Sequence, residues 1–252
     1  MSNDLYPNAV RGITWTVART PEFNTIVQVS PSFMETSIIQ AQNPRRHWEL
    51  KYDYLKDRAT DIPAGLTYTD FQTLEAFFLT HYGQGDSFLF DDVKTPDDNV
   101  GPALVAAAPN LAASLQLIQD PISGTWYSPI QIYRGGTWWE DIDYVDFTRG
   151  MSVYANGVSK TVTNTSSGGY DCNLKGPGLA ISGNSFAGMY LQWTGTPTPI
   201  GPITASFYYY WRVKFDSDQQ AFEKFMNSLW TAGDRGGASI KLRSARSYVA
   251  GS

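Results

Sequence analysis

The chain of 252 residues has few of the side chains that build disulfides and metal sites. It contains one cysteine, Cys172, and two histidines, His47 and His81. A single cysteine cannot form a disulfide within the chain, which favours folding in a reducing cytoplasm. The spacing of these three residues matches no transition-metal site, and both histidines suit structural positions. We therefore expect no metal and no cofactor.

Long apolar runs and an excess of positive charge are also missing. No run approaches the ~18 apolar residues that a membrane helix needs. Residues 1–7 lack the basic and apolar regions of a signal peptide. The formal net charge is −5, so no basic surface indicates tight binding of nucleic acid. We expect a soluble protein without membrane insertion.

Catalytic motifs are absent as well: the chain has no nucleophile elbow, Walker loop or dinucleotide fingerprint. Two groups of carboxylates are the only candidates for a catalytic or metal-binding site, because such groups could bind Ca²⁺ or act as a glycosidase pair. They are Asp91, Asp92, Asp97 and Asp98, and Glu140, Asp141, Asp143 and Asp146. Neither group has the glycine-bounded spacing of a calcium loop, so we interpret them as solvated turn residues. The chain is not expected to be an enzyme.

Aromatic residues, by contrast, are abundant. They make up 14% of the chain, with eight tryptophans, while charged residues reach only 17%. This balance favours a β-rich protein that buries surface against neighbouring molecules. Tryptophans in a β-rich chain could also line a sugar-binding face, and the candidates are Trp126, Trp138, Trp139 and Trp193.

Two stretches repeat one strand–helix–strand plan. In the first, residues 48–54 alternate apolar and charged, residues 69–82 have helical spacing, and residues 87–90 are short and apolar. Residues 211–215, 218–232 and 239–242 repeat the order. Thr69 with Gln72, and Ser217 with Gln220, are spaced as capping boxes. We predict two short helices whose core residues are Leu74, Phe77, Phe78, Phe222, Phe225 and Leu229.

Between the two stretches the pattern changes to short alternating strands and many turns. Asn156-Gly157 between two apolar runs is typical of a β-hairpin with a type I′ turn. We therefore predict a mainly β fold with two short helices, in two domains. A split platform would comprise residues 1–95 and 204–252, and an inserted antiparallel β module, a sandwich or barrel, would comprise residues 96–203.

Several segments carry a family resemblance. They are residues 22–27, 45–50 with the double arginine, 74–78, Gly83, 88–92, 156–158, 213–218 and 240–243. Together they resemble the distal tail proteins of long-tailed bacteriophages and gene transfer agents. The resemblance implies a platform built like the tail tube, as a β-sandwich or barrel.

The same resemblance implies a function and a set of partners. The chain would form a homo-hexameric ring at the virion tail tip, after synthesis and assembly in the host cytoplasm. That ring would join the tail tube protein to the tail-tip hub protein or baseplate, near the tape measure protein, and let DNA pass without specific binding. A carbohydrate-binding β module that contacts the host surface is the alternative, and a cell-wall hydrolase comes third.

Two sets of residues are candidates for these contacts. The expected subunit interface comprises Phe23, Ile26, Arg45, Arg46, Trp48 and Tyr52, on or beside a proline-punctuated N-terminal arm. Polar positions of the alternating platform strands are candidates for the ring lumen: Glu49, Lys51, Asp53, Lys214 and Asp216, with Asp218 beside them.

Overall fold

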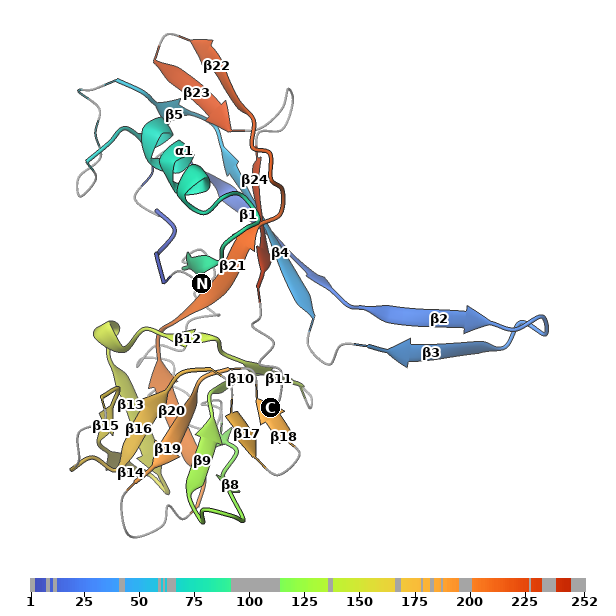
Figure 1. The fold of residues 1–252 in the computed structure, drawn as a ribbon, viewed down its shortest axis with the longest axis vertical. Coiled ribbons are helices and arrows are strands. Elements are labelled where there is room, and N and C mark those ends of the chain that lie inside the picture. The colour runs from blue at the N-terminus through green and yellow to red at the C-terminus, as the bar shows by residue number, and fades with distance from the viewer. Residues whose placement is uncertain are drawn as a thin grey trace. The chain divides into compact units, whose positions relative to one another are not determined.

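A computed structural model of the chain is mostly β, with 51% of residues in strands and 9% in helices (Figure 1). The mainly β fold is thereby confirmed. It describes residues 3–7, 10, 13–40, 44–58, 60, 62, 67–91, 114–135, 138–165, 169–177, 179–181, 184–186, 188–194, 201–226, 228–232 and 239–245.

The chain divides into two compact units. Unit 1 comprises Met1–Leu89 and Val213–Ala245, and unit 2 comprises Phe90–Arg212 and Arg246–Ser252. Residues 204–212, which we placed in the platform, thus belong to unit 2. The reason is strand pairing, because β20 (Ile203–Phe207) is hydrogen-bonded to β13 (Met151–Ala155) of that unit.

Unit 1 is built on an antiparallel sheet. Its strands β1 (Ile13–Glu22), β4 (Arg45–Tyr52), β24 (Ser239–Ser244) and the end of β21 (Tyr209–Phe215) lie in that order. The alternation in β4 decides its two faces: Arg46, Trp48, Leu50 and Tyr52 are buried, while Arg45 and Lys51 are exposed. The buried face therefore forms the core, and the charged face is left to solvent.

One helix, α1 (Asp70–Thr80), packs in unit 1 as predicted. Thr69 and Gln72 form the expected capping box. Phe77 lies against Tyr6 and Phe88, with ring centroids 5.6 and 4.9 Å away, and Leu74 is 2% exposed. After the helix, Gly83 has a left-handed φ of 58°. A Cβ at Gly83 would lie 2.9 Å from the Asp218 Cα, so the turn also needs the absence of a side chain.

The prediction of a second helix is wrong. Residues of that segment form the hairpin of β22 (Phe222–Met226) and β23 (Leu229–Ala232). β23 also pairs with β5 (Leu55–Lys56), so the three strands form one sheet. The Ser217 hydroxyl accepts from Gln219 N at 3.0 Å and forms a local turn in place of a helix cap. Phe222, Phe225 and Leu229 are therefore strand residues, and Phe222 contacts Phe71 of α1 edge-on at 5.4 Å.

Two further strands extend the β1–β4 ladder beyond the sheet. β2 (Thr25–Val29) and β3 (Glu35–Ile39) form an antiparallel hairpin, and every residue of both strands is exposed. Figure 1 shows this hairpin projecting from the ends of β1 and β4. We call residues 23–40 the arm.

Unit 2 contains two main sheets. The four-stranded one has the order β14 (Val158–Lys160), β13, β20 and β7 (Ser114–Leu115). The five-stranded one has the order β15 (Val162–Thr163), β16 (Cys172–Lys175), β19 (Tyr190–Trp193), β9 (Trp126–Pro129) and β8 (Ile118–Gln119). Asn156 and Gly157 join β13 to β14 with φ values of 50° and 76°, which confirms the predicted hairpin.

Shorter elements complete the described part of unit 2. β10 (Gln131–Gly135) pairs with β11 (Trp138–Asp141), and β17 (Leu179–Ile181) pairs with β18 (Asn184–Phe186). β12 (Tyr144–Val145) pairs with the start of β21 and leads into the 3₁₀ turn η3 (Phe147–Arg149). None of the described sheets closes into a barrel. β6 (Phe88–Phe90) follows the loop after α1, and the sequence boundary between the two units falls within it.

Candidate functional site

The arm is the most unusual surface of unit 1 because it is apolar and uncovered. Glu35 is its only charged residue. Eight large apolar side chains of the arm are exposed, among them Phe33 at 89% and Ile39 at 72%; the others are Phe23, Ile26, Val27, Val29, Met34 and Ile38. A soluble monomer rarely displays so much contiguous apolar surface, which marks an interaction site.

The strand register shows that neither side of the arm is an interior. Ile26 faces Ile38 across the hairpin, so their side chains share one face. Val27 and Val29 alternate with Ile26 and lie on the opposite face, together with Ile39. A two-stranded hairpin is marginally stable alone in water. Both faces of this hairpin are exposed.

Hydrogen bonds fix the tip of the arm. Ser30 N donates to Met34 O and Phe33 N donates to Ser30 O, each at 2.9 Å. Phe33 has a left-handed φ of 61°, which is uncommon for an aromatic residue. This turn presents Phe33 and Met34 at the end of the arm, where Met34 is 72% exposed.

The second feature of unit 1 is the charged face of its sheet, which we call the polar face. The register sets Glu49 of β4 opposite Lys241 of β24, and His47 opposite Arg243. Lys214 of β21 lies opposite Arg243, so it shares this face. Four predicted lumen residues are thus brought together on one face, namely Glu49, Lys51, Lys214 and Asp216. Lys241, Arg243 and His47 lie on the same face and were not among the predicted residues. The alternation of residues 239–243 is the sequence signal that indicates Lys241 and Arg243.

His47 lies between two carboxylates of the polar face. Its Nε2 is 2.8 Å from Glu22 Oε2, and its Nδ1 is 3.7 Å from Asp216 Oδ2. The Asp216 carboxylate also lies 3.6 Å from Arg243 Nε. Arg243 Nη2 donates to Gln84 Oε1, and Gln84 Nε2 donates to Asp216 O, both at 2.8 Å. These contacts tie β1, β4, β24 and the loop after α1 into one polar network.

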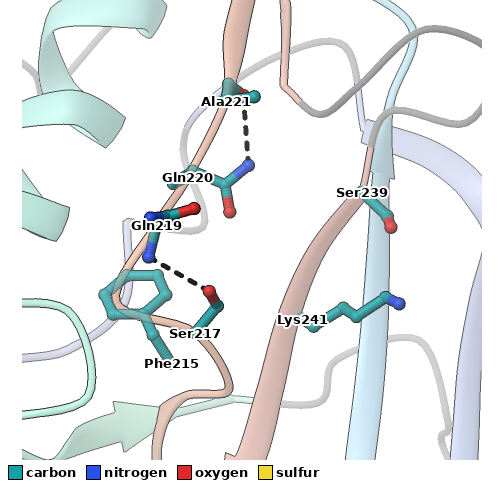
Figure 2. A pocket seen from close by; sticks show the side chains of 7 residues that line it. All are labelled: Phe215, Ser217, Gln219, Gln220, Ala221, Ser239 and Lys241. Carbon is teal, nitrogen blue, oxygen red and sulfur yellow. Dashed lines mark hydrogen bonds between the residues drawn. The ribbon is translucent and has the colours of Figure 1, made fainter.

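Two shallow hollows flank Lys241 on this face. The larger has a volume of about 320 Å³ and is lined by Ser217, Gln219, Gln220 and Ser239, with Phe215 and Ala221. Figure 2 shows Ser239 and Lys241 on one side of it and the glutamines on the other. The smaller, of about 240 Å³, is lined by Ala18, Thr20, His47, Trp48, Glu49 and Asp216. Amides and hydroxyls line the larger hollow together with Lys241, and charges of both signs line the smaller one.

The remaining predicted contact residues divide into two groups. Phe23, Ile26 and Arg45 are exposed, and Asp53 and Asp218 are exposed turn residues. Arg46, Trp48 and Tyr52 are only 8%, 1% and 3% exposed. The prediction that these three residues lie in a subunit interface is therefore corrected, because their side chains lie on the face of β4 that packs inside unit 1. Tyr52 OH, for example, is 2.8 Å from Tyr6 OH.

The carboxylates at the end of β11 and just after it are buried, which corrects our interpretation of them as solvated turn residues. Glu140, Asp141, Asp143 and Asp146 are all less than 10% exposed. Asp141 accepts from Gln131 Nε2 at 2.8 Å. Asp91 of the other group pairs with Arg149 at 3.2 Å; Asp92, Asp97 and Asp98 lie outside the described residues. Among the described residues, no group of acidic, histidine or cysteine side chains could hold a metal ion.

The cysteine, the second histidine and the buried tryptophan are in structural positions. Burial raises the pKa of the Cys172 thiol to about 12, which keeps it protonated. The His81 ring is 1% exposed and its Nδ1 is 2.8 Å from Phe77 O. Trp193 is also buried and donates to Ser128 Oγ at 3.0 Å. Trp126 is half-buried, and the side chains of Trp138 and Trp139 lie outside the described residues.

Comparison with known proteins identifies no relative. No family model matches the chain, and no curated protein matches its sequence. In the described part of the chain, no helix has the length and apolar character needed to cross a membrane.

Proposed function

We propose that this chain is a ring-forming structural subunit of a phage-type tail tip, joining the tail tube to the tip hub. The observation that carries the proposal is the arm. It is a preformed hairpin with apolar side chains on both faces and one charged residue, Glu35. A closed homo-oligomer covers such an element in every copy at once, because each subunit offers its arm to a neighbour.

The polar face supports the second part of the proposal, the passage of DNA. Glu49 and Asp216 alternate there with Lys214, Lys241 and Arg243. Interleaved charges of both signs give a weak local field. A lumen lined by this face would neither hold the DNA backbone tightly nor repel it strongly.

The test removes the arm without disturbing the sheet. Glu22 and Arg45 are register partners at the end of the β1–β4 ladder. Replacing residues 23–44 with Asn-Gly should close the ladder with a two-residue type I′ turn. We expect mass photometry to show a multimer of fixed copy number for the native chain and a monomer for this variant. Their circular dichroism should be alike after allowance for the lost hairpin.

A matched pair of point variants controls for general loss of apolar surface. Ile38→Thr changes a strand residue of the arm that is 48% exposed, and Val158→Thr changes one of unit 2 that is 59% exposed. The first should weaken association by about tenfold per interface, the effect of ~1.4 kcal/mol, and the second should not. Multimers that persist in the arm-replaced chain would contradict the proposal.

A further inference from the structure

The five-stranded sheet of unit 2 presents an ordered row of polar and aromatic side chains. The register sets Asn173 of β16 opposite Gln192 of β19, and Gln192 opposite Tyr127 of β9. A second row beside it pairs Lys175 with Tyr190. Because side chains alternate along each strand, all five of these residues lie on one face.

The opposite face of the same sheet is the core of unit 2. Leu174, Leu191 and Ser128 there are 5%, 0% and 0% exposed. On the face that carries the two rows, Tyr127, Tyr190, Gln192 and Lys175 all remain partly exposed. The two phenols, Gln192 and Lys175 are therefore on the solvent side of the sheet, and Asn173 lies beside them in a buried position.

Asn173 is the residue that points to a ligand. Its side chain is 9% exposed, and its Oδ1 is buried without a hydrogen-bond partner. A buried acceptor without a partner destabilises a fold, because its lost hydrogen bond to water is not replaced. Such a group persists where function needs it. A ligand hydroxyl on this face would supply the missing donor.

The two tyrosines give the ligand a place to stack. The rings of Tyr127 and Tyr190 meet edge-on, with centroids 5.8 Å apart. Burial, and then the neighbouring Tyr127, raise the pKa of Tyr190, so its phenol stays neutral and can donate or accept. Aromatic faces pack on the apolar C–H face of a pyranose ring, while amides pair with its hydroxyls in both directions.

We propose that this face, formed by Asn173, Gln192, Tyr127, Tyr190 and Lys175, binds an oligosaccharide chain. The site does not depend on ring assembly, so it stands or falls separately from the proposed function. It also differs from the tryptophan face that the sequence suggested, because Trp193 is buried on the core side of the same sheet.

Affinity electrophoresis tests the site on the full chain. The probes are native gels cast with laminarin, dextran, galactomannan, hydroxyethylcellulose or glycol chitin. At least one polysaccharide should retard the native protein. Tyr127→Ala should weaken that binding by about tenfold, the effect of ~1.4 kcal/mol. Tyr170→Ala is the matched control, because Tyr170 is a tyrosine of unit 2 that is 41% exposed and outside the two rows.

Asn173→Leu separates binding from folding. The leucine removes the unpaired oxygen at similar volume, so the melting temperature should stay level or rise. Retardation by the polysaccharide should be lost at the same time. The proposal is overturned if no polysaccharide retards the native chain, if both variants bind as well as the native protein, or if Asn173→Leu lowers the melting temperature.

Discussion

At the scale of single residues, the Asp146 carboxylate organises the segment that follows β12. It accepts from Thr148 N at 3.1 Å, from Arg149 Nε at 2.6 Å and from Tyr210 OH at 2.6 Å. The Arg149 guanidinium lies over the rings of Tyr208 and Tyr210, 4.7 and 5.0 Å from their centroids. One carboxylate thus holds η3, β12 and the start of β21 together within unit 2.

Replacing this carboxylate should destabilise the protein. Asp146→Asn keeps the volume of the side chain but leaves Arg149 without its closest anion. Hydrogen bonds to charged groups contribute about 1.5–3 kcal/mol, so we expect a loss of about 2 kcal/mol in the free energy of unfolding, measured by urea titration. Asp53→Asn, at an exposed residue after β4, should leave the urea midpoint unchanged. A native midpoint for Asp146→Asn would contradict the role we assign to the carboxylate.

The same contacts make a prediction about pH. Burial would raise the pKa of Asp146, but hydrogen bonds from Thr148, Tyr210 and Arg149 outweigh it and hold that pKa at about 2. In the unfolded chain an aspartate has a pKa of about 3.9. The stabilisation is therefore present above pH ~4 and is lost as the pH falls through ~2. The difference in melting temperature between the native chain and Asp146→Asn should shrink over that range.

At the scale of elements, α1 and the β22–β23 hairpin show which local signals can be trusted. Both segments have helical spacing of apolar residues and a capping-box sequence. In α1 the box forms, because Thr69 Oγ1 accepts from Gln72 N and Thr69 N donates to Gln72 Oε1. In the second segment, pairing of Trp230 with Leu55 of β5 and stacking of Trp230 on Phe71 at 4.3 Å favour a hairpin. Such long-range contacts override helical periodicity and cannot be seen in the local sequence.

The capping box gives a prediction at this scale. Thr69 is 3% exposed, and its hydroxyl also donates to Asp57 Oδ1 at 3.2 Å. Thr69→Ala should lower the free energy of unfolding by about 1–2 kcal/mol, measured by urea titration. Thr69→Ser keeps the hydroxyl and should retain most of the stability. Equal losses in both variants would show that the methyl group, rather than the cap, is what matters.

The arm was predicted only in part from the sequence. The prolines of this segment indicate an arm before Arg45, and the structure forms it from the hairpin of β2 and β3. Alternation alone does not say whether Ile26 and Ile38 pack inside the same chain or remain uncovered, and only the three-dimensional structure shows them 40% and 48% exposed. The face that carries Asn173 was harder to predict, because it is assembled by pairing strands distant in sequence, such as β19 with β9.

At the scale of the whole molecule, the two units carry different surfaces. Unit 1 carries the apolar arm and the polar face, the two features that a ring subunit around passing DNA needs. Unit 2 carries buried carboxylates that serve packing and an outward face suited to a glycan. The sequence predicted part of the polar face because period-two alternation in β4 and β21 decides which side chains share a side. It did not predict that Trp48 and Tyr52 lie inside unit 1.

Negative-stain electron microscopy of the purified chain at micromolar concentration tests the central claim most directly. Class averages should show closed rings of one copy number with a central hole, because each apolar arm must be covered by a neighbouring copy. Rings should vanish in the variant with residues 23–44 replaced by Asn-Gly. A field of single, well-folded particles of the native chain at the same concentration would contradict the account.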